Sequence, residues 1–230
     1  MQPGVILTGL ACGALLAVAG LTLWDGLRQT PGLSRAAWVL GWVAAALLLI
    51  GALLVWQGNH DVPALRLILI AALAAPPGLH RRRPSHWSNV MFILPALALA
   101  EVGLFLISKP VAGETVSLPI RPMELAIVVC GGLGARALGA ALNVIAIPSS
   151  IPKLGAFAVT YALLTLLVGS TALVNLWQRG TMWGGSASEA GLAAVWLTWG
   201  AAWLGPRQRP RLRAGLIVMA ASLLIVLAVG

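Results

Sequence analysis

Charged residues are scarce in this sequence, and acidic residues are the rarest of them. Only 9% of the 230 residues are charged, and only six are Asp or Glu. A typical soluble domain carries about 25% charged residues, because it needs them to cover its surface. The shortage therefore argues against a sizeable soluble domain, and the 60% of hydrophobic residues predicts a protein embedded in a membrane.

Residues that hold metals or carry out chemistry are also few. The two cysteines, Cys12 and Cys130, lie in separate apolar runs without the spacing of a disulfide framework or a metal site. All three histidines fall between the apolar runs, so no predicted helix core supplies the imidazole that a heme or metal site in a membrane usually needs. The sequence also lacks a nucleophile–base pair, a phosphate-binding glycine loop and a carboxylate cluster, which argues against hydrolase, kinase and metalloprotease activity.

Long apolar runs fill the chain from one end to the other. Eight of them approach the roughly 20 residues that a helix needs to cross a bilayer. Continuous runs favour helices over the alternating pattern of a membrane barrel, so we predict an all-α, polytopic helix bundle that forms one membrane domain over residues 1–230. The third run is the shortest and contains Pro76-Pro77 near its end. The eight segments are Val5–Trp24, Ala36–Trp56, Ala64–Leu79, Val90–Ile107, Met123–Ile147, Leu154–Trp177, Ala187–Leu204 and Leu212–Gly230.

The formal charge of +9 comes from arginines and lysines in short loops between these runs. We interpret it as a topology signal, because cytoplasmic loops of membrane proteins carry an excess of Lys and Arg. The odd-numbered loops are therefore predicted to be cytoplasmic and both termini outside, in a bacterial-type plasma (inner) membrane, and no nucleic-acid partner is expected. The odd loops hold ten such residues (Arg28, Arg35, Arg81, Arg82, Arg83, Lys153, Arg207, Arg209, Arg211 and Arg213) and the even loops four (Arg66, Lys109, Arg121 and Arg179).

Two ionisable residues fall deep inside predicted helices. Glu101 lies about twelve positions into the fourth segment and Arg136 about fourteen positions into the fifth, well inside a hydrocarbon layer roughly 30 Å thick. An unpaired charge there costs several kcal/mol, so we predict an ion pair between neighbouring helices. A proton or ligand site is the alternative. Around Arg136, the small residues Gly131, Ala135 and Gly139 repeat at four-residue spacing, which predicts close helix packing.

Ten tryptophans accompany a single tyrosine. Those at the ends of predicted helices are typical of anchoring at the membrane interface. Another group, from Trp183 to Trp203, crowds one outer loop and the helix that follows it.

Residues 154–204 resemble the tryptophan-rich region of the cytochrome c assembly family, the CcsA- and HemX-like heme-handling membrane proteins. That family has an apolar helix and then an outer loop that closes with W-x-W-D-P-K-E. In this sequence the segment from Trp183 to Glu189 stands in the place of that signature, and Trp196 and Trp199 follow on the next helix. The resemblance implies a multi-pass scaffold with this loop on the outer side and heme as the family's cofactor.

The sequence also departs from the family pattern. Gly185, Ser186, Ala187 and Ser188 replace the second Trp, the Asp, the Pro and the Lys of the signature. Family members flank the loop with two external histidines that ligate heme, whereas Glu124 stands where the first is expected and no histidine follows the loop in this sequence. The chain therefore resembles a family scaffold without its usual heme ligands.

Three functions stay open. We favour a non-catalytic subunit of a larger membrane electron-transfer or assembly complex, with other membrane protein subunits and lipid as partners and no cofactor expected. The second is a heme-handling assembly protein with unconventional ligands such as His60 or Glu124. The third is a small-solute or proton transporter that uses Glu101 and Arg136.

Overall fold

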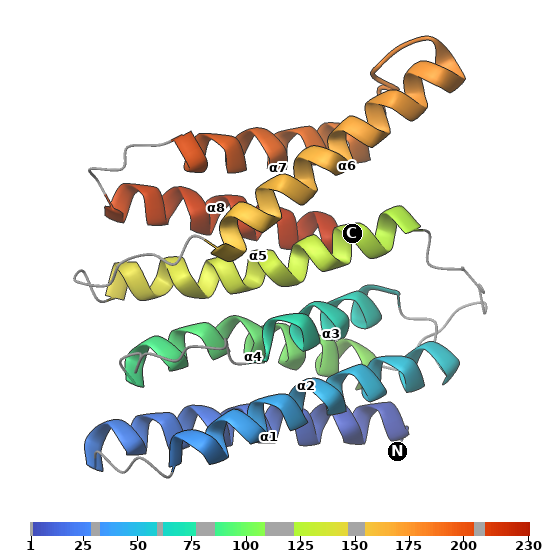
Figure 1. Cartoon of the computed structure of the whole chain (residues 1–230). Coiled ribbons are helices and arrows are strands. Elements are labelled where there is room, and N and C mark those ends of the chain that lie inside the picture. The colour runs from blue at the N-terminus through green and yellow to red at the C-terminus, as the bar shows by residue number, and fades with distance from the viewer. Residues whose placement is uncertain are drawn as a thin grey trace. The chain divides into compact units, whose positions relative to one another are not determined.

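The structure is a computed structural model that describes residues 2–28, 33–58, 62–76, 86–108, 122–146, 155–204 and 210–230. These residues form eight helices and no strand (Figure 1), which confirms the predicted all-α fold. The helices are α1 (Pro3–Arg28), α2 (Leu33–Gly58), α3 (Val62–Ala74), α4 (His86–Ser108), α5 (Pro122–Ala146), α6 (Gly155–Arg179), α7 (Ala187–Leu204) and α8 (Pro210–Val229).

Six of these helices, α1, α2, α4, α5, α6 and α8, are long and apolar enough to cross a membrane. A multi-pass helical membrane protein is therefore the architecture that length and composition support. The other two helices differ from them. Helix α3 has 13 residues and extends only about 20 Å, which is short of a hydrocarbon layer roughly 30 Å thick. Helix α7 has 18 residues and carries the polar residues Ser188 and Glu189 in its first turn. That α3 and α7 also cross the membrane stays a prediction.

Helix α3 differs from its sequence prediction at the C-terminal end. The apolar run continues to Leu79, but the helix ends at Ala74, two residues before Pro76-Pro77. Proline disfavours helical backbone in the residue before it and cannot donate the next helical hydrogen bond, so the helix ends although the composition stays apolar. Arg66, which the charge count assigned to a loop, lies inside this helix.

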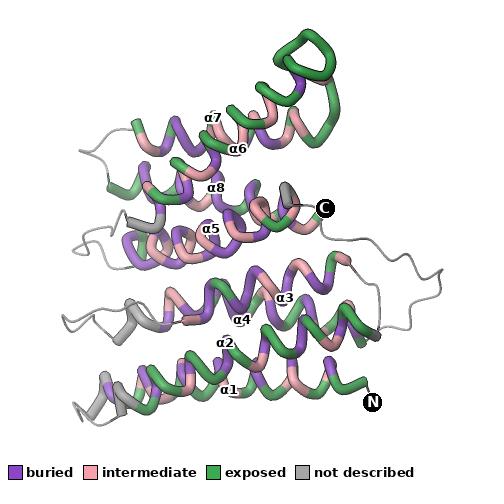
Figure 2. The backbone as a smooth tube through the Cα atoms, turned by 45° about the vertical axis from the view of Figure 1, so that its right-hand side comes forward, coloured by how far each residue is buried: buried purple, intermediate pink, exposed green. Residues whose placement is uncertain are grey.

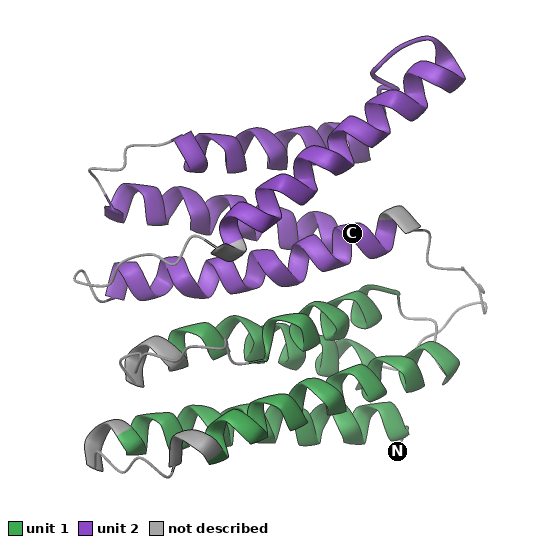
Figure 3. Cartoon of the chain, viewed as in Figure 1, with its two compact units in different colours: residues 1–119, 229 green, residues 120–228, 230 purple. Residues whose placement is uncertain are grey.

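The chain forms two compact units (Figure 3). Unit 1 comprises residues 1–119 and 229, and unit 2 comprises residues 120–228 and 230. The sequence predicts a single domain because no polar linker separates these two parts.

Small residues allow helices to approach closely within unit 1, where α1 packs against α2 and α4 and α3 packs against the same two helices. A Cβ atom on Gly51 of α2 would lie 2.9 Å from the hydroxyl oxygen of Thr8 on α1, and one on Gly103 of α4 would lie 2.8 Å from Ile68 Cγ1 on α3. The buried Thr8 hydroxyl donates a 2.8 Å hydrogen bond to the Gly4 carbonyl. Such local bonds satisfy a hydroxyl inside an apolar bundle.

The core of unit 2 draws side chains from all four of its helices, and Trp199 of α7 is its largest fully buried residue. Helix α5 approaches this core through Gly134, where a Cβ atom would lie 2.9 Å from Leu224 Cδ2 of α8 and 3.8 Å from the Trp199 ring. Glycine is therefore the residue that fits there.

The small-residue face predicted on α5 is buried at all three of its positions, Gly131, Ala135 and Gly139. Gly134, one residue before Ala135, makes the close contact that the structure describes on this helix. The role of the predicted face in helix packing stays a prediction.

Candidate functional site

The tryptophan-rich region folds as a hairpin of α6, a loop over residues 180–186, and α7. Two glycines reverse the chain direction in this loop, since Gly180 has φ 72° and Gly185 has φ 75°. Side chains other than glycine rarely adopt this left-handed backbone. The Gly180 amide donates a 3.0 Å hydrogen bond to the Leu176 carbonyl and so caps the end of α6.

The carboxylate of Glu189 ties the three parts of the hairpin together. Its Oε1 atom accepts a 2.9 Å hydrogen bond from Asn175 Nδ2, which is buried on α6. Its Oε2 atom accepts a 2.7 Å hydrogen bond from the backbone amide of Gly184 in the loop. One half-buried side chain at the start of α7 therefore binds both the preceding helix and the loop.

The beginning of α7 is capped by Ser186. The Ser186 hydroxyl accepts a 3.3 Å hydrogen bond from the Glu189 amide, and its carbonyl accepts a 3.1 Å hydrogen bond from the Ala190 amide. Ser186 and Glu189 have the Ser-x-x-Glu spacing of a capping box, in which the glutamate usually bonds the amide of the capping serine. In this hairpin the glutamate carboxylate interacts with the Ser186 backbone and also accepts a bond from the amide of Gly184, so the cap extends into the loop.

The charged side chain of Arg179 also belongs to this network around Gly184. Arg179 Nη1 donates a 3.4 Å hydrogen bond to the Gly184 carbonyl, so both backbone polar groups of this residue are bonded. Glu189 does not belong to any of the six helices that are long and apolar enough to cross a membrane. The hydrogen bond from Asn175 lowers the pKa of Glu189 below its ordinary value of 4.5, and the Gly184 amide and the Arg179 charge act in the same direction, against partial desolvation. Glu189 is therefore ionised at neutral pH.

No side chain larger than hydrogen fits at position 184 without displacing this network. A Cβ atom on Gly184 would lie 2.5 Å from Arg179 Nη1 and 2.6 Å from Glu189 Oε1. Both atoms belong to flexible side chains, but Arg179 Nη1 is held by its hydrogen bond to the Gly184 carbonyl and Glu189 Oε1 by its hydrogen bond from Asn175. Glycine thus allows the two charged groups to close over the loop backbone.

Below this network, five aromatic rings stack in a column between α6 and α7. Phe157 stacks on Trp199 and Trp203 with centroids 5.0 and 5.7 Å apart, and Tyr161 stacks on Trp203 and Trp196 at 6.2 and 6.5 Å. The interplanar angles lie between 12° and 19°. Centroid distances in this range are typical of favourable aromatic pairs, so the column holds α6 against α7.

Two of these tryptophans also have their indole nitrogens bonded. Trp199 Nε1 donates a 3.1 Å hydrogen bond to the Phe157 carbonyl, and Trp196 Nε1 donates a 3.0 Å bond to the Thr165 hydroxyl. On the neighbouring helix, buried Arg213 donates through Nε to the Ala202 carbonyl at 3.2 Å and so caps the end of α7. Both ends of α7 are therefore held by side chains of unit 2.

The structure brings most of the sequence-predicted hairpin residues into these two arrangements. Glu189 lies at the centre of the loop network, and Trp196 and Trp199 lie in the aromatic column. Trp183 is exposed in the loop. Sequence reasoning missed Asn175, a lone amide within an apolar helix, and it also missed the capping-box spacing of residues 186–189, which was a usable signal.

The other candidate residues lie elsewhere. Glu101 is exposed on α4 in unit 1, and Arg136 is half-buried on α5 in unit 2, so their ion pair stays a prediction. Glu124 is half-buried in the first turn of α5. His60 lies outside the described residues.

The residues at the positions of the tryptophan-rich signature are not of the types that usually ligate heme. Heme iron is held by His, Cys, Met or Tyr side chains, whereas the signature positions carry tryptophans and a glutamate whose two oxygens already accept hydrogen bonds. Within the described part of the chain, no three His, Cys, Asp or Glu side chains are placed to hold a metal ion.

Comparison of the chain with family models, curated proteins and solved structures finds no match. The resemblance to the cytochrome c assembly family rests on the hairpin residues alone. The function that this resemblance implies is therefore a proposal.

Proposed function

We propose that this chain is a non-catalytic integral membrane subunit, built on a cytochrome c assembly-like scaffold, of a larger membrane electron-transfer or assembly complex. The observation that carries this proposal is that the Glu189 carboxylate is hydrogen-bonded within its own hairpin. Both of its oxygens accept hydrogen bonds from the same hairpin, one from Asn175 and one from Gly184. A carboxylate that closes its own loop supports structure, because the bonds to Asn175 and Gly184 fix its position within the hairpin.

The tryptophans of the resembling region support the same reading. Trp199 is fully buried, and its indole nitrogen is bonded within unit 2. Trp196 is stacked on Tyr161 and bonded to Thr165. These rings hold two helices together, as expected for a scaffold that presents a fixed surface to other membrane subunits. The bias of Lys and Arg between the two sets of loops, ten against three once Arg66 is placed inside α3, supports a bacterial-type plasma membrane as its location.

Purification from native membranes in a mild detergent tests the proposal. We expect a tagged chain to co-purify with other membrane proteins at a fixed ratio, which native mass spectrometry measures. An unrelated tagged membrane protein from the same membranes is the control for non-specific capture. Recovery of this chain alone, at every detergent concentration that keeps it folded, would contradict the subunit role.

An absorption spectrum of the same preparation separates the proposal from the heme-handling alternative. We expect no stoichiometric heme. A Soret band with a heme-to-protein ratio near one would favour the alternative instead. In that case His60→Ala and Glu124→Ala would show whether the two candidate residues ligate the iron, because loss of a ligand shifts the band or removes it.

A further inference from the structure

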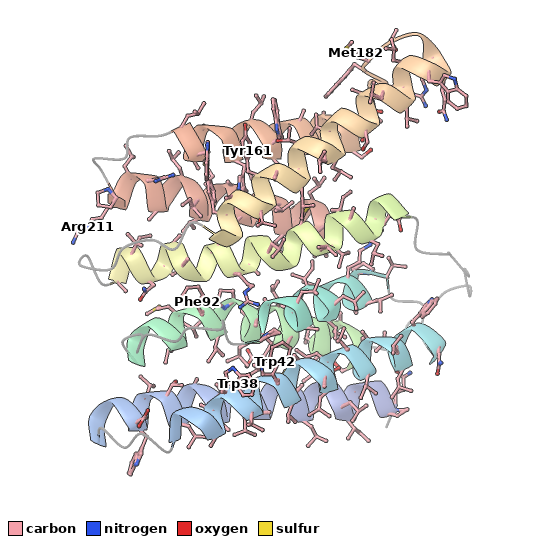
Figure 4. The ribbon with its side chains drawn as sticks, viewed as in Figure 1. Trp38, Trp42, Phe92, Tyr161, Met182 and Arg211 are labelled. Carbon is pink, nitrogen blue, oxygen red and sulfur yellow. The ribbon has the colours of Figure 1, made fainter. Side chains whose placement is uncertain are left out.

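The tip of the α6–α7 hairpin exposes large apolar side chains. Trp177 in the last turn of α6 is 85% exposed, and Met182 and Trp183 in the loop are 66% and 52% exposed. Figure 2 shows the exposed backbone at this end of α6 and its loop, and Figure 4 places Met182 at the tip. We name Trp177, Met182 and Trp183 the hairpin tip.

The length of α6 places this tip at the edge of the bilayer. The helix has 25 residues and extends about 37 Å, whereas the hydrocarbon layer is roughly 30 Å thick. If α6 spans the layer, its last turn and the loop that follows lie among the lipid headgroups. Tryptophan is enriched at this depth because its ring is apolar and its N–H is polar.

The loop bonds part of its own backbone within the hairpin. Glu189 accepts a hydrogen bond from the Gly184 amide, and Arg179 donates one to the Gly184 carbonyl. The Trp183 carbonyl accepts a 3.1 Å hydrogen bond from the Thr181 hydroxyl. The Trp183 carbonyl and both backbone groups of Gly184 are therefore bonded, whereas the side chains of Met182 and Trp183 are exposed.

We propose that the hairpin tip binds the lipid surface, with Trp177, Met182 and Trp183 inserted into the headgroup layer of the outer leaflet. The Glu189 network lowers the cost of this insertion, because the amide and the carbonyl of Gly184 are bonded within the hairpin and need no partner from water. Arg179 is exposed beside the tip, and a cationic side chain at the end of a membrane helix extends its charged group into the polar headgroup layer.

Spin-label accessibility in lipid nanodiscs tests this inference on the full chain. A label at Met182→Cys is compared with one at Ser188→Cys, an exposed polar position in the first turn of α7, after the buried Cys12 and Cys130 are changed to alanine. We expect the ratio of collisions with oxygen to collisions with a water-soluble nickel chelate to be severalfold higher at Met182. Equal ratios at the two positions would overturn the proposal. Exclusion of both agents from Met182 would also overturn it, because it would indicate a covering protein.

A second measurement needs no cysteine variant. Lipids brominated near the headgroup should quench tryptophan fluorescence more in the native chain than in Trp183→Phe, because Trp183 is expected at that depth. Trp199→Phe is the matched control, since Trp199 is fully buried in unit 2 and its removal should leave the headgroup-quenched component unchanged. If Trp183→Phe also leaves this component unchanged, the ring is not at the lipid surface.

Discussion

Asn175 Nδ2 donates a 2.9 Å hydrogen bond to Glu189 Oε1 and joins the end of α6 to the first turn of α7. The two residues are 14 positions apart in the sequence, and the loop between them must reverse direction for the bond to form. A charged acceptor makes this a stronger bond than one between neutral groups. The same carboxylate also binds the Gly184 amide, so a single side chain determines the shape of the loop.

We expect the hairpin to loosen in acid. The pKa of Glu189 is lowered below its ordinary value of 4.5, so the ionised network contributes stability above that value and loses it as the pH falls through the lowered pKa. The motional freedom of a spin label at Ser188→Cys, measured from neutral to acidic pH, should increase in this window. In Glu189→Gln the label should be freer at neutral pH and show no such transition. The same transition in both proteins would assign it to another group.

Gly185 should resist substitution for a backbone reason alone. Its φ is 75° and an added Cβ atom would meet nothing within 4 Å, so Gly185→Ala should lower the free energy of unfolding by about 1–2 kcal/mol through strain. Gly185→Asn should cost less, because asparagine tolerates this conformation better. Gly169→Ala on the exposed face of α6 is the matched control and should be neutral or stabilising. Thermal unfolding in detergent compares the three, and equal losses at Gly185 and Gly169 would exclude backbone strain as the cause.

Trp199 should contribute far more to stability than Trp177. Trp199→Ala removes a fully buried ring that stacks on Phe157 and bonds its carbonyl, and such truncations cost about 3–5 kcal/mol. Trp177→Ala changes a ring that is 85% exposed and should stay within about 0.5 kcal/mol. The difference in melting temperature between the two variants checks this ranking. Similar losses would mean that the aromatic column does not hold α6 against α7.

Glu101 and Arg136 are predicted to form one ion pair inside the membrane. If the site is dry, each single change to alanine should cost about 3–5 kcal/mol, because it leaves the other charge uncompensated. The pair Glu101→Leu with Arg136→Met should cost much less. A double-mutant cycle on thermal stability in detergent measures the coupling, and additive losses would show that the two residues act separately.

The charge bias predicts that Arg82 is cytoplasmic and that the hairpin loop is outside. Single cysteines at Arg82 and Ser188, labelled from one side of the membrane, test this orientation. Ser188 is the better outer position, since a Cβ atom at Gly184 would collide with the Glu189 carboxylate. Arg82 lies outside the described residues. Labelling of both positions from the same side would contradict the predicted topology.

The presence of the helices was predictable from the apolar runs. In a bilayer, a continuous apolar run of this length satisfies its backbone hydrogen bonds by forming a helix. The prediction for α7, Ala187–Leu204, matches the structure at both ends, since a glycine-rich loop precedes it and Gly205-Pro206 follows. The prediction for α3 was wrong at its C-terminal end. The apolar composition continues beyond Ala74, but Pro76 and Pro77 end the helix.

The sequence by itself determined the helical membrane fold and the placement of Trp183, Glu189, Trp196 and Trp199 on one hairpin, because apolar length, turn glycines and chain connectivity are local properties. The tertiary structure alone decided what these residues contact. Glu189 meets Asn175 only after two left-handed glycines reverse the chain. The aromatic column likewise depends on the register of α6 against α7. Such pairings depend on how distant segments pack together, and periodicity and composition do not specify that.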